Sequence, residues 1–84
     1  MNEIKKTNRD NNLKEFVRSE ISEYFKKIDG YPIDNVYNLV ISEVEKPLIE
    51  ETLKYCKGNQ TAASELLGLS RGTLRKKIKK YKIS

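Results

Sequence analysis

The densest group of side chains that could do chemistry lies at the end of the sequence, and all of its charged members are basic. Residues 71–84, RGTLRKKIKKYKIS, contain seven lysines and arginines and no acidic residue. Residues 54–84 together contain nine basic residues and one acidic residue, whereas residues 1–53 contain eight basic and eleven acidic residues. Like charges this close repel one another unless an anion neutralises them. The distribution therefore predicts a polyanionic ligand for this end of the chain.

The spacing of these residues predicts a helix with one apolar strip between cationic flanks. At about 100° per residue, Leu74, Ile78 and Tyr81 should face the protein, with Gly72 almost opposite. The flanks consist of Arg71, Arg75, Lys79 and Lys82 on one side and Thr73, Lys76 and Lys80 on the other, with Lys77 at the edge. A charged face is often only a solvated one, but such a face normally mixes signs. Cations on both flanks favour a helix in the major groove of DNA, where phosphates line both walls and Arg71 could reach a guanine edge.

A second, shorter helix is predicted just before the basic helix. Asn59 should cap it by accepting a hydrogen bond from one of the amides of its first turn, and Gly68 should end it. Ser70 should then cap the basic helix. The inner face of the shorter helix is expected to consist of Ala63, Leu66 and Leu67. Two helices joined by a three-residue turn that contains glycine are typical of a helix-turn-helix.

The first part of the chain predicts a polar arm followed by an amphipathic helix. Residues 1–12 are rich in Asn, Lys and Asp and carry too little apolar surface to offset the entropy of ordering, so they are expected to be a flexible arm. From Leu13 the apolar residues recur at helical spacing. Asn12 is expected to cap this helix, and Gly30 to end it in the left-handed conformation.

The next apolar pattern predicts a helix that contains a proline. Asp34 is its expected cap, and Gly58 should close it. Pro47 removes one backbone hydrogen bond, so the segment should either kink or split in two; the apolar spacing stays in phase across the proline, which favours a kinked single helix. Cys56, near its end, is expected to be a small buried hydrophobic residue.

The two long helices carry more apolar surface than a two-helix hairpin can bury. Leaving several large apolar side chains in water would consume much of the stability of an 84-residue chain. We therefore predict an all-α homodimer with four helices per chain and a four-helix core formed by residues from Leu13 to about Leu53 of each copy. The expected division is a flexible arm (1–12), dimerisation helices (13–57) and a helix-turn-helix (58–84).

Composition argues against several other classes of protein. With no histidine and a single cysteine, Cys56, the chain offers no disulfide, no cysteine-rich or mixed metal site and no recognisable acid, base and nucleophile set. We expect no enzyme activity, no cofactor and no small-molecule substrate. No membrane span or signal peptide is apparent, which predicts a cytoplasmic protein. The main alternative to a DNA-binding protein is a protein-interaction module whose basic end docks on an acidic protein.

The segments GNQTAASELLG, RGTLRKKIKKY and VYNLVISEVEKPLIEETLKY resemble the Fis family of bacterial nucleoid-associated proteins, over about Val17 to Ile83. The resemblance implies an intertwined homodimer that binds degenerate sites in double-stranded DNA on the nucleoid, bends the duplex and regulates transcription. The recognition helices of such a dimer lie closer together than one turn of straight DNA, so specificity comes largely from DNA deformability.

The resemblance also assigns roles to individual residues. Arg71 should read a base. Phosphates should be held by Asn59, Thr61, Thr73 and Lys76, and the backbone or flanking DNA by Lys57, Arg75, Lys77 and Lys79. Gln60, Ser70 and Lys80 complete the predicted DNA-binding set. The turn before the shorter helix could contact RNA polymerase through Lys54, Lys57, Gly58 and Gln60.

The sequence departs from the family pattern at two places. Ser70 stands where relatives often have Asn, which could change the bases tolerated beside the guanine. Residues 1–12 are shorter than the β-hairpin arm of the relatives that activate DNA invertases, and they lack alternating apolar positions. The resemblance therefore implies DNA binding, but it does not imply stimulation of recombination.

Overall fold

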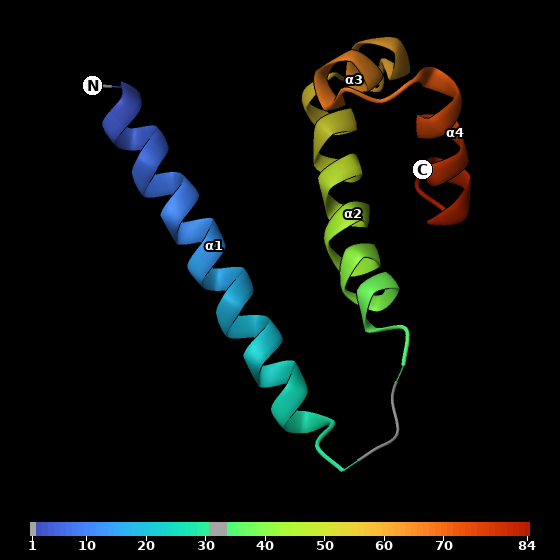
Figure 1. Cartoon of the computed structure of the whole chain (residues 1–84). Helices are drawn as coiled ribbons and strands as arrows, with labels where there is room; N and C mark the ends of the chain where they lie inside the picture. Colours follow the sequence, from blue (N-terminus) through green and yellow to red (C-terminus); the bar gives the residue numbers. More distant parts are fainter. Residues whose placement is uncertain (1, 31–33) are drawn as a thin grey trace. The chain divides into compact units, whose positions relative to one another are not determined.

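A computed structural model describes residues 2–30 and 34–84, with side chains from Asn12 onward, and contains four helices in the described residues. They are α1 (Asn2–Lys27), α2 (Val36–Tyr55), α3 (Gln60–Leu67) and α4 (Arg71–Lys80), as Figure 1 shows. No strand occurs in this part of the chain, so the predicted all-α fold with four helices per chain is confirmed. The chain divides into two compact units, Met1–Val36 and Tyr37–Ser84.

The first unit consists mainly of α1, and this helix begins earlier than the sequence predicted. The expected start at Leu13 is wrong, because α1 begins at Asn2 and Asn12 lies inside it instead of capping it. Neither glycine nor proline occurs before Gly30, so nothing in residues 2–27 breaks the helix. Gly30 has a φ of 87°, and its predicted left-handed conformation is confirmed.

The second unit begins with α2, which runs without a break through Pro47. The prediction of one helix across the proline is therefore confirmed. The expected cap, Asp34, lies one residue too early, because Val36 is the first helical residue and Asn35 precedes it with a φ of 62°. Asparagine adopts this left-handed conformation more readily than most residues. Residues 31–33, between Gly30 and Asp34, lie outside the described residues.

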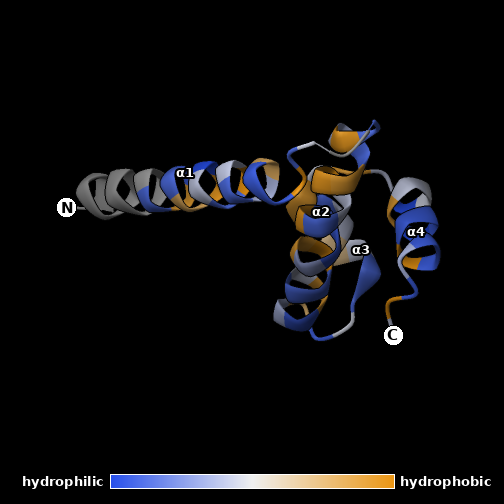
Figure 2. Ribbon diagram, turned by 90° about the horizontal axis from the view of Figure 1, so that it is seen from below, coloured by the Kyte–Doolittle hydropathy of each residue, from blue (hydrophilic) through white to orange (hydrophobic). Residues whose placement is uncertain are grey.

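The core of the second unit lies where α2, α3 and α4 meet. Its buried members are Ile49 and Leu53 of α2, Ala63 of α3 and Leu74 of α4. Partly buried side chains pack around them, namely Cys56, Leu67, Ile78, Tyr81 and Ile83. Figure 2 shows the contrast between α2, which mixes hydrophobic and hydrophilic colours, and α4, which is mostly hydrophilic. The predicted inward strip of α4 agrees with this arrangement, whereas Cys56, which was predicted to be buried, is partly buried.

The burial of two apolar residues in the second unit differs from the prediction. Leu66 was expected on the inner face of α3 but is 60% exposed, because that face is formed by Ala63, Ser64 and Leu67. Ala63 and Ser64 are both small and buried, so the neighbouring helices can approach α3 closely. Ile49 was not predicted and is the most buried large side chain of α2.

The end of α4 turns back onto the core. The N–H of Lys82 donates to the carbonyl of Lys79 at 3.2 Å, and that of Ile83 donates to the carbonyl of Ile78 at 3.0 Å. Lys82 takes the left-handed conformation that this type of helix end requires, with a φ of 54°. The turn brings Ile83 against the core, so the chain beyond α4 helps to fix the helix in place.

Candidate nucleic-acid interface

The helix-turn-helix is held by the caps that the sequence predicted. Asn59 Oδ1 accepts from the amide of Ala62 at 3.0 Å and begins α3. Gly68 ends α3 with a φ of 76°, and the amides of Gly68 and Leu69 donate to the carbonyls of Glu65 and Ser64, at 3.2 and 2.9 Å. These hydrogen bonds restrict the conformation of the turn and thereby fix the direction of α4 relative to α3.

The start of α4 is organised by two hydrogen bonds between Ser70 and Thr73. Ser70 Oγ accepts from the amide of Thr73 at 3.1 Å and donates its own hydrogen to Thr73 Oγ1 at 2.9 Å. A hydroxyl has one hydrogen to donate, so the Ser70 hydroxyl, which donates to Thr73, has no hydrogen left for a ligand. Thr73 only accepts in this pair and keeps its hydrogen for another acceptor. The Thr73 hydroxyl is therefore suited to donate to a phosphate oxygen, whereas Ser70 is suited to hold the Thr73 side chain in position.

Asn59 is similarly placed to serve two purposes. Its side-chain oxygen is occupied by the amide of Ala62, but its NH₂ group can still donate. The residue is exposed, as are Gln60 and Thr61 beside it. Capping of α3 and a contact to phosphate are thus compatible in the same residue.

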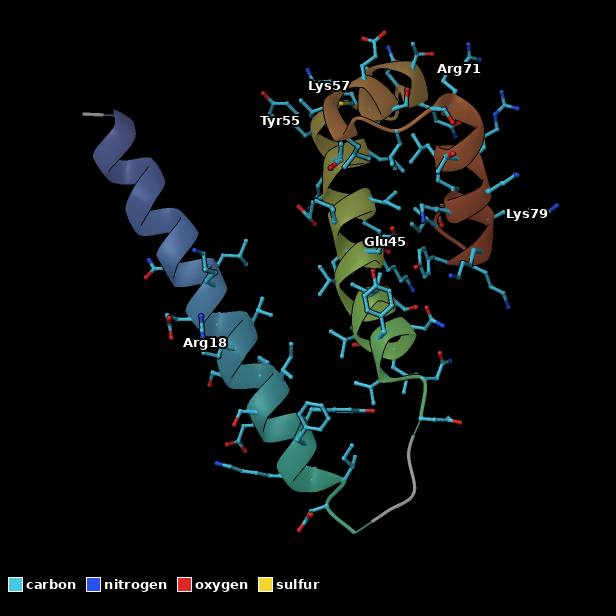
Figure 3. All side chains as sticks on the ribbon, in the orientation of Figure 1. Arg18, Glu45, Tyr55, Lys57, Arg71 and Lys79 are labelled. Carbon is cyan, nitrogen blue, oxygen red and sulfur yellow. The ribbon has the colours of Figure 1, made fainter. Side chains whose placement is uncertain are left out.

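Most of the basic side chains of α4 are exposed and make no ion pair within the described part of the chain. This group comprises Arg71, Arg75, Lys76, Lys79 and Lys80. Lys80 lies 5.2 Å from the centre of the Tyr81 ring, a distance suited to a cation–π contact. Figure 3 shows Lys79 pointing away from α2. The exposed surface of α4 therefore carries several positive charges with no negative charge of its own helix among them.

Lys77 differs from the other basic residues of α4 because it forms an ion pair across the core. Its Nζ lies 3.0 Å from Oε2 of Glu45 on α2, and both side chains are mostly shielded, at 27% and 22% exposure. Tyr81 Oη donates to the other oxygen, Oε1, at 2.6 Å. Glu45 lies on the side of α2 that faces α4, as Figure 3 shows. One carboxylate of α2 thus binds both Lys77 of α4 and Tyr81, the residue that follows the helix.

These contacts also explain the ionisation of Glu45. The hydrogen bond from Tyr81 is the largest effect and lowers the pKa of the carboxyl, and the hydrogen bond and positive charge of Lys77 lower it further. Partial burial acts in the opposite direction and is outweighed. Glu45 therefore stays negatively charged at neutral pH. No spacing rule could find this contact from the sequence, because Glu45 and Tyr81 are 36 residues apart.

The turn between α2 and α3 forms a second exposed group. Lys57 has a φ of 54°, and the amide of Gly58 donates to the carbonyl of Leu53 at 2.8 Å. Lys54 Nζ lies 3.8 Å from Oε2 of Glu51 in the same helix. Because both side chains are more than 70% exposed, this ion pair contributes little to stability. Lys57 thus adds an exposed positive charge just before the start of α3.

The described residues contain neither a candidate metal site nor a candidate membrane span. No group of three or more histidine, cysteine or acidic side chains is placed to hold a metal ion in the part of the chain that the structure covers. Within the same residues, no helix combines the length and the apolar character needed to cross a membrane.

Comparison with known proteins places the sequence among bacterial regulators. The sequence model described as "Bacterial regulatory protein, Fis family" matches residues 40–81. A Fis-like DNA-binding protein of Pseudomonas aeruginosa is 54% identical over 69 residues, which are 82% of this chain and 66% of that protein. DNA-binding protein Fis of Proteus mirabilis is 44% identical over 82% of this chain and 70% of its own length. DNA-binding protein Fis of Actinobacillus succinogenes is 47% identical over 86% of this chain and 73% of its own length. The chain therefore belongs to the Fis family of bacterial regulatory proteins.

Proposed function

We propose that this protein is a nucleoid-associated regulator of transcription that binds and bends double-stranded DNA as a homodimer in the bacterial cytoplasm. The observation that carries the proposal is the exposed face of α4, whose charged residues are all basic and which is held at a fixed angle by capped helix ends. The similarity of the chain to DNA-binding proteins also supports DNA as the ligand. In this proposal α4 enters the major groove with its N-terminal turn first.

Individual residues take their roles from their position and their available donors. Arg71, in the first turn of α4, reads a guanine edge, because its fork of N–H groups matches the two acceptors of guanine. Thr73 and the NH₂ group of Asn59 donate to phosphates. The remaining exposed cations hold the backbone and the flanking DNA, namely Lys57, Arg75, Lys76, Lys79 and Lys80.

The proposed dimer accounts for a row of exposed apolar side chains on α2. Tyr37, Ile41, Val44, Leu48 and Tyr55 are 76, 38, 48, 51 and 78% exposed. Their spacing of four, three, four and seven places them on one stripe of the helix. A stripe of this kind is what a second helix normally covers. We propose that a second copy of the chain covers it, and that the two α4 helices then fit DNA only when the duplex bends.

The salt dependence of binding tests this proposal against docking on an acidic protein. If the dimer makes roughly 6–10 phosphate contacts, its affinity for a DNA duplex should fall about 10³–10⁵-fold between 50 and 200 mM salt. Lys76→Met should reduce the salt slope by about two for the dimer, one for each subunit. Lys77→Met should leave the slope unchanged, since the Lys77 ammonium is held by Glu45. Gel-shift titrations at several salt concentrations measure all three slopes.

The two methionine variants form a matched pair, because they remove the same charge from adjacent positions of α4. Circular dichroism should first establish that both remain folded. Equal losses of slope would show that Lys77 also contacts phosphate in the complex. A flat response of the wild type to salt would overturn DNA binding itself.

A second comparison tests base reading by Arg71. Arg71→Ala should cost about 1–3 kcal/mol on a preferred site and little on random DNA, because the lost contact is to a base edge. Lys79→Ala should weaken binding to all sequences alike, because Lys79 is placed to meet the backbone. Binding measured on a preferred duplex and on a scrambled duplex of equal length separates the two effects. Equal losses by both variants on both duplexes would contradict the role given to Arg71.

A further inference from the structure

Gly72, the second residue of α4, has no structural reason to be glycine in the free protein. A Cβ atom built on it would meet nothing within 4 Å. Its φ is not in the left-handed range, unlike those of Gly30, Gly58 and Gly68, which lie between 76 and 87°. Neither the packing nor the backbone conformation around Gly72 therefore requires glycine.

Glycine at this position should also weaken the helix. It loses more backbone freedom on folding than alanine does, and it contributes no side chain to the helix surface. Gly72 is exposed and lies two residues before Leu74, which is fully buried, so it faces away from the core. The residues beside it on the outer surface are Arg71, Thr73 and Lys76. The missing side chain is thus at the centre of the proposed DNA-contacting face.

We propose that Gly72 marks the point at which the backbone of α4 comes closest to the floor of the major groove, and that DNA is what excludes a side chain there. Glycine is commonly found where a backbone approaches a ligand closely. A deep position for the helix axis would let Arg71, the preceding residue, reach a base edge. It would also leave the protein without a base contact at position 72. The inference rests on the proposed insertion of α4 into DNA.

The test is Gly72→Ala, for which stability and DNA binding should change in opposite directions. The melting temperature should rise by about 2–8 °C, because alanine favours the helix and its methyl group meets no protein atom. Affinity for a preferred DNA duplex should fall at least about tenfold, because the methyl group of each subunit must be fitted against the bases. Calorimetry and gel-shift titration at 50 mM salt give the two values.

Gly68→Ala is the matched control, since it makes the same chemical change at a glycine with a φ of 76°. It should lower the melting temperature, because alanine is strained in that conformation. A wild type that does not bind DNA would overturn the proposed function. Wild-type binding together with unchanged or tighter binding by Gly72→Ala would overturn the close approach alone. A lower melting temperature for Gly72→Ala would show that the glycine is needed by the fold.

Discussion

Leu74→Ala should lower the free energy of unfolding by about 2–5 kcal/mol, the range observed when a buried leucine is truncated to alanine. Leu74 is 0% exposed and is the only residue of α4 in the buried core, where it joins Ile49, Leu53 and Ala63 among the described residues. Its side chain is the fully buried contact between α4 and the rest of the second unit. Small domains are stabilised by only about 5–15 kcal/mol, so a large part of that stability would be lost.

Leu66→Ala is the matched control for this prediction. It removes the same atoms from α3, but Leu66 is 60% exposed, so its truncation should change the free energy of unfolding by less than about 1 kcal/mol. Urea denaturation followed by circular dichroism measures both values at one protein concentration. Similar losses for the two variants would mean that Leu66 is covered in solution, either by a second copy or by a different packing of α3.

The helix-turn-helix was predictable from the sequence because its determinants are local. The caps Asn59 and Ser70 and the glycine at 68 act within three or four residues, and the structure confirms each of them. The start of α1 was not predictable in the same way. Polar composition suggested a flexible arm, but residues 2–12 contain no helix breaker, and the helix continues through them.

The contacts that the sequence did not reveal join distant parts of the chain. Ile49 was missed because α2 carries apolar residues on two sides, and only the packing of α3 and α4 distinguishes the buried side from the exposed stripe. Glu45 was missed as a partner of Lys77 and Tyr81 for the same reason. In the proposed interface, the sequence indicated which residues are cationic, whereas the structure distinguishes Lys77 from its exposed neighbours.

The exposed stripe of α2 leads to the prediction with the largest effect on assembly. Leu48→Asp should weaken dimerisation at least about 100-fold, because each subunit would place a carboxylate in the apolar contact between the copies. Leu48 is 51% exposed in the single chain, so the change should be tolerated by the isolated subunit. DNA affinity should fall by about 10²–10⁴-fold, because a monomer can occupy only one half-site. Sedimentation equilibrium at low micromolar concentration measures the assembly, and gel shifts measure the binding.

Leu66→Asp provides the control, because it introduces the same charge at a leucine of α3 that is also largely exposed in the single chain, at 60%. A protein that works as a monomer would treat the two substitutions alike in sedimentation, since both aspartates would lie in water. In a dimer that covers the stripe, Leu48→Asp dissociates the subunits while Leu66→Asp leaves them associated. If the wild type sediments as a monomer, or if Leu48→Asp remains a dimer, the α2 stripe is not the contact between subunits. A monomeric wild type would also contradict the proposed bending of DNA, because its single basic helix contacts too short a length of duplex to hold it curved.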